Sequence, residues 1–208
     1  MARTVDASAK RLQILESAAA QFARKGYEAT LMDDVASAAG VSKGSLYDYF
    51  KNKEDLFYAV FEWFQGRLLE ASVAQAGDKM GARERLVAFA EASVGALVSQ
   101  INLYPVTLEI WAAAAKAGTR KRFAKAMRKL YEGYRREVVA LIRTAQEQGE
   151  IKPGVEPEIL ASVLIGAVDG LLLQYWLDPA FDAKAWVGAF LLNLFDGIGT
   201  PQARKHRP

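Results

Sequence analysis

The chain has 208 residues, of which 51% are hydrophobic and 25% are charged, and its formal net charge is +3. This composition is typical of a folded soluble protein and excludes a largely disordered chain. The absence of cysteine excludes disulfides and thiolate metal sites, and it favours the reducing cytoplasm. The single histidine, His206, lies in the carboxyl-terminal tail. We therefore expect no histidine-based catalysis, no enzymatic activity, no cofactor and no metal site.

Two segments of the chain bear on targeting and on membrane insertion. The first residues, MARTVDASAKRLQ, lack the apolar core of a secretion signal. Residues 159–177 are long and apolar enough to raise the question of a membrane span. Asp169 stands near their centre, where a charge costs roughly 2.5–3.5 kcal/mol on insertion scales. We therefore expect a helix at a protein interface, no contact with a membrane, and a cytoplasmic location.

Apolar residues recur every three or four positions along almost the whole chain, and the alternation typical of strands is absent. This pattern predicts an all-α protein with about nine helices. We divide it into a small head over residues 1–52, a larger helical body over residues 53–200, and a flexible tail over residues 201–208.

The predicted head contains three helices. The first covers residues 7–25 and ends at Gly26, with leucine, alanine and phenylalanine side chains on one face, beginning at Leu12. A capping box, TLMD at residues 30–33, is expected to begin the second helix, which ends at Gly40. Ser42 is expected to cap the third helix.

The fourth predicted helix connects the head to the body. Asn52, with Asp55 three residues later, is expected to cap its first turn. The helix continues past Leu69, and residues 77–81 form a break. The remaining predicted helices cover residues 82–99, 104–115, 119–148, 156–177 and 183–198.

The second and third helices have the spacing of a helix-turn-helix motif. The small side chain of Ala36 allows the third helix to approach the second closely. Gly40, four residues later, can adopt the left-handed conformation of the turn. Val41, Leu46 and Phe50 supply the apolar side of the third helix. A helix-turn-helix of this kind presents the start of its second helix to the major groove of DNA.

The outward side chains of this motif suit DNA. Two serines and a lysine lie at the amino end of the third helix, where free backbone N–H groups favour phosphate. The glycine among them allows close approach of the backbone, and two tyrosines can donate hydrogen bonds to phosphates or pack on thymine methyls. The alternative is a small helical subdomain in which the tyrosines serve only packing. We predict DNA contacts by Ser42, Lys43, Gly44, Ser45, Tyr47, Tyr49 and Lys53.

One continuous stretch carries a family resemblance. It has GY at 26–27, Thr30, VA at 35–36, AGVSKGSLY at 39–47, YF at 49–50 and KEDL at 53–56. In this order it resembles the tetracycline-repressor (TetR) family of bacterial transcription regulators. The body resembles the family only in its helix count and in GAVDGLLLQYWLDP at 166–179. The resemblance implies DNA contacts by Thr30, Lys43, Ser45, Tyr47, Tyr49 and Lys53. It departs from the family pattern at Leu31, where many members have a hydroxyl, and at Tyr49, where many have histidine.

The last two predicted helices have features of a dimer interface. Two glycines four residues apart on one helix face allow another helix to come close, and apolar residues extend that face. Two such helices from each of two chains would form a four-helix interface, and ordinary packing within one chain is the alternative. A dimer would hold two heads roughly 34–36 Å apart, the separation of successive major grooves. The predicted interface residues are Val163, Gly166, Gly170, Leu173, Leu177, Trp186, Phe190 and Leu194.

Aromatic residues on several helices of the body indicate a ligand pocket, since ligand sites are mostly apolar with a few polar groups. Glu109 or Asp169 would supply a polar group, although aromatic residues at helical spacing also occur in ordinary cores. A hydrophobic drug, a phenolic compound or an acyl-coenzyme A would each fit. The basic residues at 116–136 would suit the acyl-coenzyme A, although an ordinary solvated helix face is the interpretation we favour for them. The predicted pocket residues are Trp63, Phe64, Phe89, Tyr104, Trp111, Met127, Tyr131, Tyr134 and Asp169.

We therefore expect a dimeric transcriptional repressor that binds a near-palindromic operator and is released by a small hydrophobic or amphipathic inducer. The alternative is an architectural DNA-binding protein, or an activator, without a small-molecule ligand. In the repressor interpretation, operator binding and ligand binding would weaken each other by the same factor.

Overall fold

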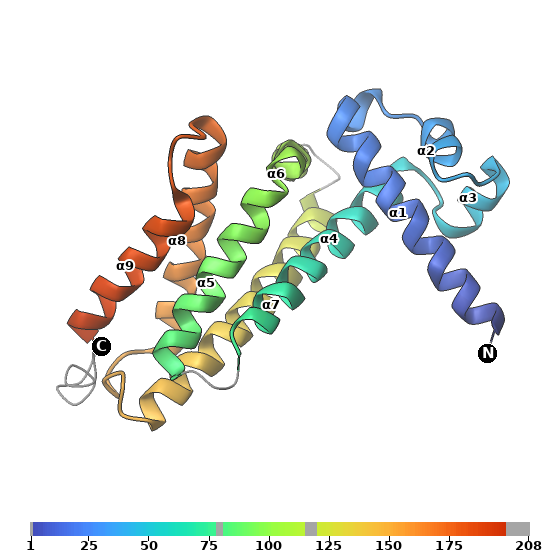
Figure 1. The fold of residues 1–208 in the computed structure, drawn as a ribbon. Helices are drawn as coiled ribbons and strands as arrows, with labels where there is room; N and C mark the ends of the chain where they lie inside the picture. Colours follow the sequence, from blue (N-terminus) through green and yellow to red (C-terminus); the bar gives the residue numbers. More distant parts are fainter. Residues whose placement is uncertain (1, 78–80, 115–119, 199–208) are drawn as a thin grey trace. The chain divides into compact units, whose positions relative to one another are not determined.

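The computed structural model describes residues 2–77, 81–114 and 120–198 (Figure 1). Within these ranges the protein is all-α, with nine α-helices, a short 3-10 helix at Ile101–Leu103 and no strand. The predicted tail over residues 201–208 lies outside the described residues. The helices are α1 (Ala2–Ala29), α2 (Met32–Ala38), α3 (Lys43–Tyr49), α4 (Lys53–Gln75), α5 (Ala82–Ser99), α6 (Tyr104–Ala114), α7 (Arg120–Glu147), α8 (Pro157–Leu177) and α9 (Ala183–Ile198).

The contacts within the chain divide it into two units. Residues 1–66 and 102–127 form the first unit, and residues 67–101 and 128–208 form the second. This division differs from a boundary after residue 52, because the first half of α4, α6 and the start of α7 pack with the amino-terminal helices. The contacts therefore group the helix-turn-helix with these further helices, and the head over residues 1–52 stays a prediction.

The core of the first unit is built on one face of α1. Ile14 and Phe22 are buried there, whereas Leu12, which was expected on this face, is 40% exposed. Phe57 of α4 packs edge-on against Phe22, with the ring centroids 5.1 Å apart. Tyr27 completes the cluster, at 4.6 Å from the Phe57 ring. These rings join α1 to α4 and place the motif between them.

Helix α1 continues past the glycine that was expected to end it. Gly26 has φ of 76° and ψ of 168°, a conformation that interrupts the helix, and the chain then resumes helical geometry as far as Ala29. A positive φ of this size is readily adopted only by glycine. The glycine thus produces a kink with a short final turn beyond it.

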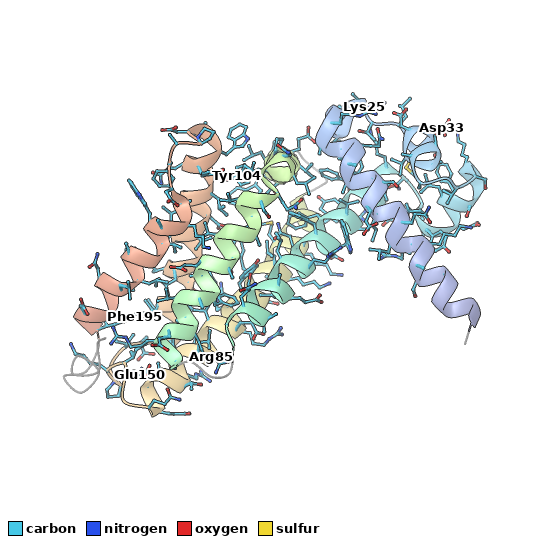
Figure 2. All side chains as sticks on the ribbon, in the orientation of Figure 1. Lys25, Asp33, Arg85, Tyr104, Glu150 and Phe195 are labelled. Carbon is cyan, nitrogen blue, oxygen red and sulfur yellow. The ribbon has the colours of Figure 1, made fainter. Side chains whose placement is uncertain are left out.

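The second unit has its own hydrophobic core, formed mainly by α5, α7, α8 and α9. One end of this unit is closed by polar contacts, near the side chains of Arg85, Glu150 and Phe195 labelled in Figure 2. Glu150 accepts a hydrogen bond from the backbone N–H of Arg83 at 2.9 Å, and Arg85 Nε donates to the carbonyl of Ala76 at 3.2 Å. Gly149, with φ of 71°, follows the end of α7 as predicted.

Candidate nucleic-acid interface and effector sites

The turn between α2 and α3 has the predicted geometry. Gly40 has φ of 61°, which is the left-handed conformation expected from the motif. The backbone N–H of Val41 donates to the carbonyl of Ala36 at 3.0 Å, which closes the turn. Gln13 of α1 donates to the carbonyl of Ala39 at 2.9 Å. The turn is therefore held both by its own backbone and by α1, and this fixes the direction of α3.

Two predicted caps are confirmed. The Ser42 hydroxyl accepts from the backbone N–H of Ser45 at 3.1 Å and begins α3. The side-chain oxygen of Asn52 accepts from the backbone N–H of Asp55 at 2.8 Å and begins α4. Each side chain pairs a backbone donor that the helix itself leaves unpaired.

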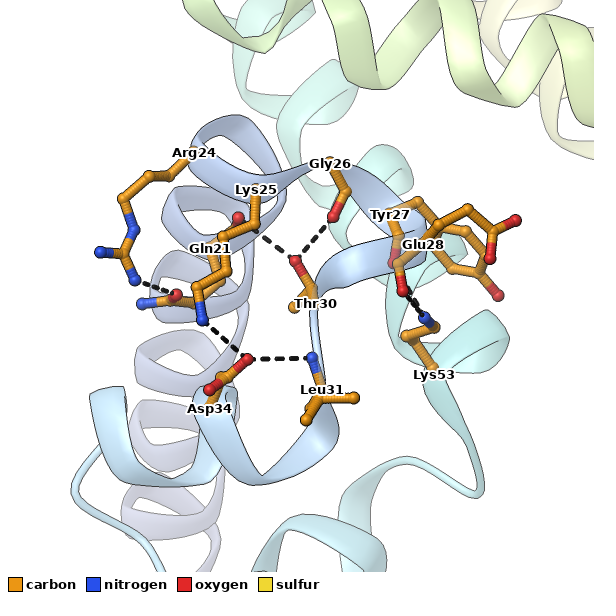
Figure 3. A network of polar contacts seen from close by, with 10 residues as sticks. All are labelled: Gln21, Arg24, Lys25, Gly26, Tyr27, Glu28, Thr30, Leu31, Asp34 and Lys53. Carbon is orange, nitrogen blue, oxygen red and sulfur yellow. Dashed lines mark hydrogen bonds and ion pairs between the residues drawn. The ribbon is translucent and has the colours of Figure 1, made fainter.

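The predicted capping box at residues 30–33 is wrong, and the predicted contact of Thr30 with DNA stays a prediction. Thr30 is 0% exposed. Its hydroxyl donates backward to the carbonyl of Gly26 at 2.7 Å, and also lies 3.3 Å from the carbonyl of Gln21 (Figure 3). The buried threonine hydroxyl thus pairs with backbone carbonyls near the end of α1 and stabilises that end of the helix.

The first turn of α2 is capped by a different residue. The Asp34 carboxylate accepts from the backbone N–H of Leu31 at 3.1 Å and forms an ion pair with Lys25 of α1 at 2.9 Å (Figure 3). The hydrogen bond from Lys25 lowers the pKa of Asp34, and the hydrogen bond from Leu31 adds to this effect. The capping residue is thus one position later than the sequence pattern indicated.

The exposed surface of α3 carries several of the predicted DNA-binding residues. Leu46 and Phe50 are buried in the head, as predicted, while Lys43, Gly44 and Tyr47 are exposed. Ser45 and Tyr49 are partly buried, and Ser42 is exposed at the start of the helix. Exposure on one side of a firmly packed helix is the arrangement that a major-groove reader needs.

Lys43 has a carboxylate partner on the protein surface. Its ammonium group forms an ion pair with Asp33 of α2 at 2.9 Å, and both side chains are more than half exposed. The hydrogen bond with Asp33 raises the pKa of Lys43. Exposed pairs of this kind are weak, because both partners remain well solvated. A DNA phosphate can therefore replace the carboxylate at small cost.

Whereas Lys43 is paired with a carboxylate, Lys53 is paired with backbone carbonyls and an aromatic ring. Its ammonium group donates to the carbonyls of Tyr27 and Glu28, both at 2.9 Å, and lies 4.6 Å from the centre of the Tyr27 ring (Figure 3). A cation at the carboxyl end of a helix is favourable, since the last carbonyls carry partial negative charge. The end of α1 thus stabilises a lysine that is unfavourable for the first turn of its own helix.

Sequence reasoning missed the side chains that hold α6 and α7 to the rest of the first unit. The Glu109 carboxylate accepts from the backbone N–H of Tyr27 at 2.8 Å, and its other oxygen is 3.0 Å from the point that a Cβ at Gly26 would occupy. Arg122 donates to Asp55 at 2.8 Å and lies 4.5 Å from the centre of the Tyr58 ring. No local pattern identifies contacts between positions 67 and 82 residues apart.

The predicted pocket residues divide between the two units. In the second unit the Phe89 and Tyr134 rings pack edge-on at 6.1 Å, and the Tyr131 hydroxyl donates to Asp169 at 2.8 Å. Glu109, considered as a polar group of the pocket, instead caps the backbone at the kink of α1. A common pocket for the whole set therefore stays a prediction. The residues of the first unit are Trp63, Phe64, Tyr104, Trp111 and Met127.

Helices α8 and α9 carry an apolar surface that their own chain leaves uncovered. A Cβ added at Gly166 or Gly170 would meet no atom within 4 Å, so neither glycine serves close packing within the chain. Leu177 is 68% exposed, and Leu194 is partly buried. By length and composition α8 also qualifies as a membrane span. The other exposed members of the predicted interface are Val163, Leu173, Trp186 and Phe190.

Comparisons with known families and proteins match both halves of the chain. Residues 14–60 match the family model described as bacterial regulatory proteins, tetR family, and residues 82–196 match that of the BetI-type transcriptional repressor, C-terminal. The fatty acid metabolism regulator protein of Bacillus subtilis is 26% identical over 191 residues, which cover 91% of this chain and 95% of that protein.

Two solved structures have the same fold and hold small molecules. The transcriptional regulator FadR from Bacillus subtilis, in complex with stearoyl-CoA, has a TM-score of 0.75 and 26% identity, covering 90% of this chain and 98% of that chain. A transcriptional regulator from Saccharomonospora viridis, in complex with choline, has a TM-score of 0.72 and 25% identity, covering 93% of this chain and 99% of that chain.

A helix-turn-helix with an exposed second helix, followed by a helical body, defines a DNA-binding regulator of transcription. The chain belongs to the tetR family of bacterial regulatory proteins, because the two family models together match most of its length. It is a transcriptional regulator and not an enzyme. Regulators of this family bind operator DNA as dimers.

Proposed function

We propose that this protein is a cytoplasmic repressor that binds a near-palindromic operator through α3 and leaves it when a small molecule binds the body. The observation that carries the proposal is the division of α3 into a buried and an exposed side. Leu46 and Phe50 anchor the helix, while Lys43, Gly44 and Tyr47 are free of the core. Lys43 would bind a phosphate or a guanine, and Tyr47 a phosphate or a thymine methyl.

The apolar surface of α8 and α9 is the proposed seam between two copies of the chain. Gly166 and Gly170 are open on their own chain, which supports close approach by a helix of another molecule. A two-fold seam uses the same surface on both subunits. It would hold two copies of α3 at the separation of successive major grooves, and it would cover the exposed side chains of Val163, Leu177 and Trp186.

The proposed response to ligand depends on α6 and on the start of α7, which belong to the first unit without being part of the helix-turn-helix. Glu109 of α6 bonds to the kink of α1, and Arg122 of α7 bonds to the first turn of α4. A ligand that moves either helix would therefore move the head. Coupling of 1–3 kcal/mol, which is typical of allostery, would change operator affinity roughly 5- to 150-fold.

The test is a selection of bound duplexes from a random pool with the purified full-length protein. We expect a two-fold symmetric sequence whose half-sites are about one helical turn, or a multiple of it, apart. Stearoyl-CoA and choline, the molecules held by two structural relatives, are then added to the complex. Failure to select any sequence would contradict the proposal. An operator that no tested ligand releases would favour an architectural protein.

A further inference from the structure

Asp169 differs from the other polar side chains along the contact between α7 and α8. Arg143 of α7 forms an ion pair with Glu158 of α8, and Arg135 donates to Ser162 one turn further along. Asp169 follows on α8, but the residue that faces it from α7 is Tyr131. Among the described residues Asp169 has no cationic partner, so its carboxylate depends on a single phenolic hydrogen bond.

The surroundings of this carboxylate are largely buried and include several aromatic rings. Burial raises the pKa of Asp169, and the hydrogen bond from Tyr131 opposes that effect only in part. The Tyr134 hydroxyl is buried and has no hydrogen-bond partner in the described part of the chain. Burial, and then the nearby charge of Asp169, raise the pKa of Tyr134, so this hydroxyl is neutral and close to the carboxylate. Phe89 packs against the Tyr134 ring.

A carboxylate without a cationic partner and an unpaired hydroxyl within one small region indicate a missing ligand atom. Buried charges in proteins are normally paired, and a buried hydroxyl normally has a partner. A positively charged group with several N–H bonds satisfies both needs, because it neutralises Asp169 and donates to the oxygen of Tyr134. Aromatic faces add further attraction for a cation. An anion would be repelled, and a neutral alcohol would leave the charge unpaired.

We propose that Asp169 and Tyr134 bind the ammonium group of a small organic amine, with Tyr131 and Phe89 beside it. This inference rests on the proposed function, since the amine would be the effector or part of it. Tyr131 would retain its hydrogen bond to Asp169 and position the carboxylate. The free oxygen of Asp169 and the Tyr134 hydroxyl would each accept one N–H from the ligand.

The proposal includes a pH dependence whose direction is fixed by the carboxylate. Ammonium binding requires ionised Asp169, whose pKa is raised by burial. Lowering the pH therefore protonates Asp169 and weakens amine binding. The titratable groups that face it are the hydroxyls of Tyr131 and Tyr134, and burial raises the pKa of Tyr134, so that hydroxyl stays neutral. Affinity should rise with pH until Asp169 is fully ionised.

The experiment measures phenethylamine binding by the full-length protein, using calorimetry and the shift of the melting temperature. The probe combines an ammonium group with an aromatic ring. 2-Phenylethanol has the same shape without the charge, and choline has the charge without N–H bonds. Asp169→Asn should weaken phenethylamine binding roughly 10- to 100-fold, the loss expected for a hydrogen bond to a charged group. Glu132→Gln, which removes an exposed carboxylate from α7, is the matched control and should bind normally.

The results separate this inference from the proposed function. Equal binding of 2-phenylethanol, stronger binding of choline, or unchanged binding by Asp169→Asn would each overturn the amine site. If stearoyl-CoA releases the selected operator while phenethylamine does not bind, the amine site is wrong and the repressor proposal stands. If Asp169→Asn does not fold, Tyr134→Phe decides, because it removes only the hydroxyl; unchanged phenethylamine binding by that variant would overturn the site.

Discussion

Lys43 and Lys53 are both lysines at the first position of a helix, yet they are engaged in different ways. Lys43 is held by one exposed carboxylate, that of Asp33. Lys53 donates to two carbonyls at the end of α1 and lies over an aromatic ring. The first contact is easily exchanged for a phosphate, whereas the second is part of the structure of the head.

Lys43 should therefore act mainly on DNA affinity. Lys43→Ala should weaken binding to operator and to random duplexes alike, and should reduce the slope of log affinity against log salt by about 1. Asp33→Asn should have the opposite effect at low salt, because it removes the carboxylate that competes with phosphate, and the gain should fade as salt is raised. Fluorescence anisotropy over a salt series measures both. A Lys43→Ala variant with wild-type salt dependence would show that α3 is not the DNA-binding element.

Thr30 should act on stability instead. Thr30→Val keeps the shape of the side chain and removes the hydroxyl that donates to Gly26, so it should lower the free energy of unfolding by about 1–3 kcal/mol. Thr30→Ser keeps the hydroxyl and is the control for the loss of the donor. Urea unfolding measures the difference. Weaker DNA binding by fully folded Thr30→Val, at unchanged stability, would instead support the predicted DNA contact.

The kink in α1 depends on another helix. The backbone N–H of Tyr27 follows the interruption at Gly26 and is paired with the Glu109 carboxylate of α6. A glycine at this position therefore has two functions, since it adopts the positive φ and leaves space for the carboxylate. The final turn of α1 in turn supplies the carbonyls that hold Lys53 of α4. Three helices thus depend on one irregular residue.

Glu109→Ala should destabilise the protein, because it leaves the Tyr27 N–H without its partner, and the expected loss is about 1–3 kcal/mol in urea unfolding. Glu109→Gln is the matched control, since its side-chain oxygen still accepts the hydrogen bond, and it should lose less. The two variants should differ in the same order in the ligand concentration needed to release operator. Equal stability of the alanine and glutamine variants would show that this contact contributes nothing.

Two copies of the chain are needed to read a symmetric operator, and the exposed side of α8 is the proposed seam. Gly170→Leu adds a side chain where the chain itself has open space, so the helical content of the monomer should be retained. The added leucine would obstruct a partner helix, and the protein should elute as a monomer from a sizing column and lose operator affinity.

Gly66→Leu is the control for this variant. Gly66 also meets no atom within 4 Å of an added Cβ, but it lies on α4, away from α8 and α9 in sequence. It should remain a dimer. A Gly170→Leu variant that elutes as a dimer would remove this face of α8 from the interface.

The helices and the helix-turn-helix were predictable because their signals are local. Apolar spacing, a glycine at the turn and serine or asparagine caps act within a few residues, and the bounds of α5 and α9 agree with the pattern. The cap of α2 was predicted one residue too early, because threonine and aspartate can each cap a helix. Groups of α1 decided between them by bonding to Thr30 and to Asp34. The Thr30 hydroxyl donates to the carbonyl of Gly26, and the Asp34 carboxylate forms an ion pair with Lys25.

The linear order of residues was enough to define an all-α DNA-binding protein, since each helix and turn is specified by neighbours in the chain. It was not enough to show which side chains are available to a ligand or to DNA. That depends on contacts between distant positions, as with Tyr27 and Glu109, and on burial, as with Asp169 and Tyr134. Such contacts arise only when helices pack, because packing selects among partners that the sequence makes equally possible.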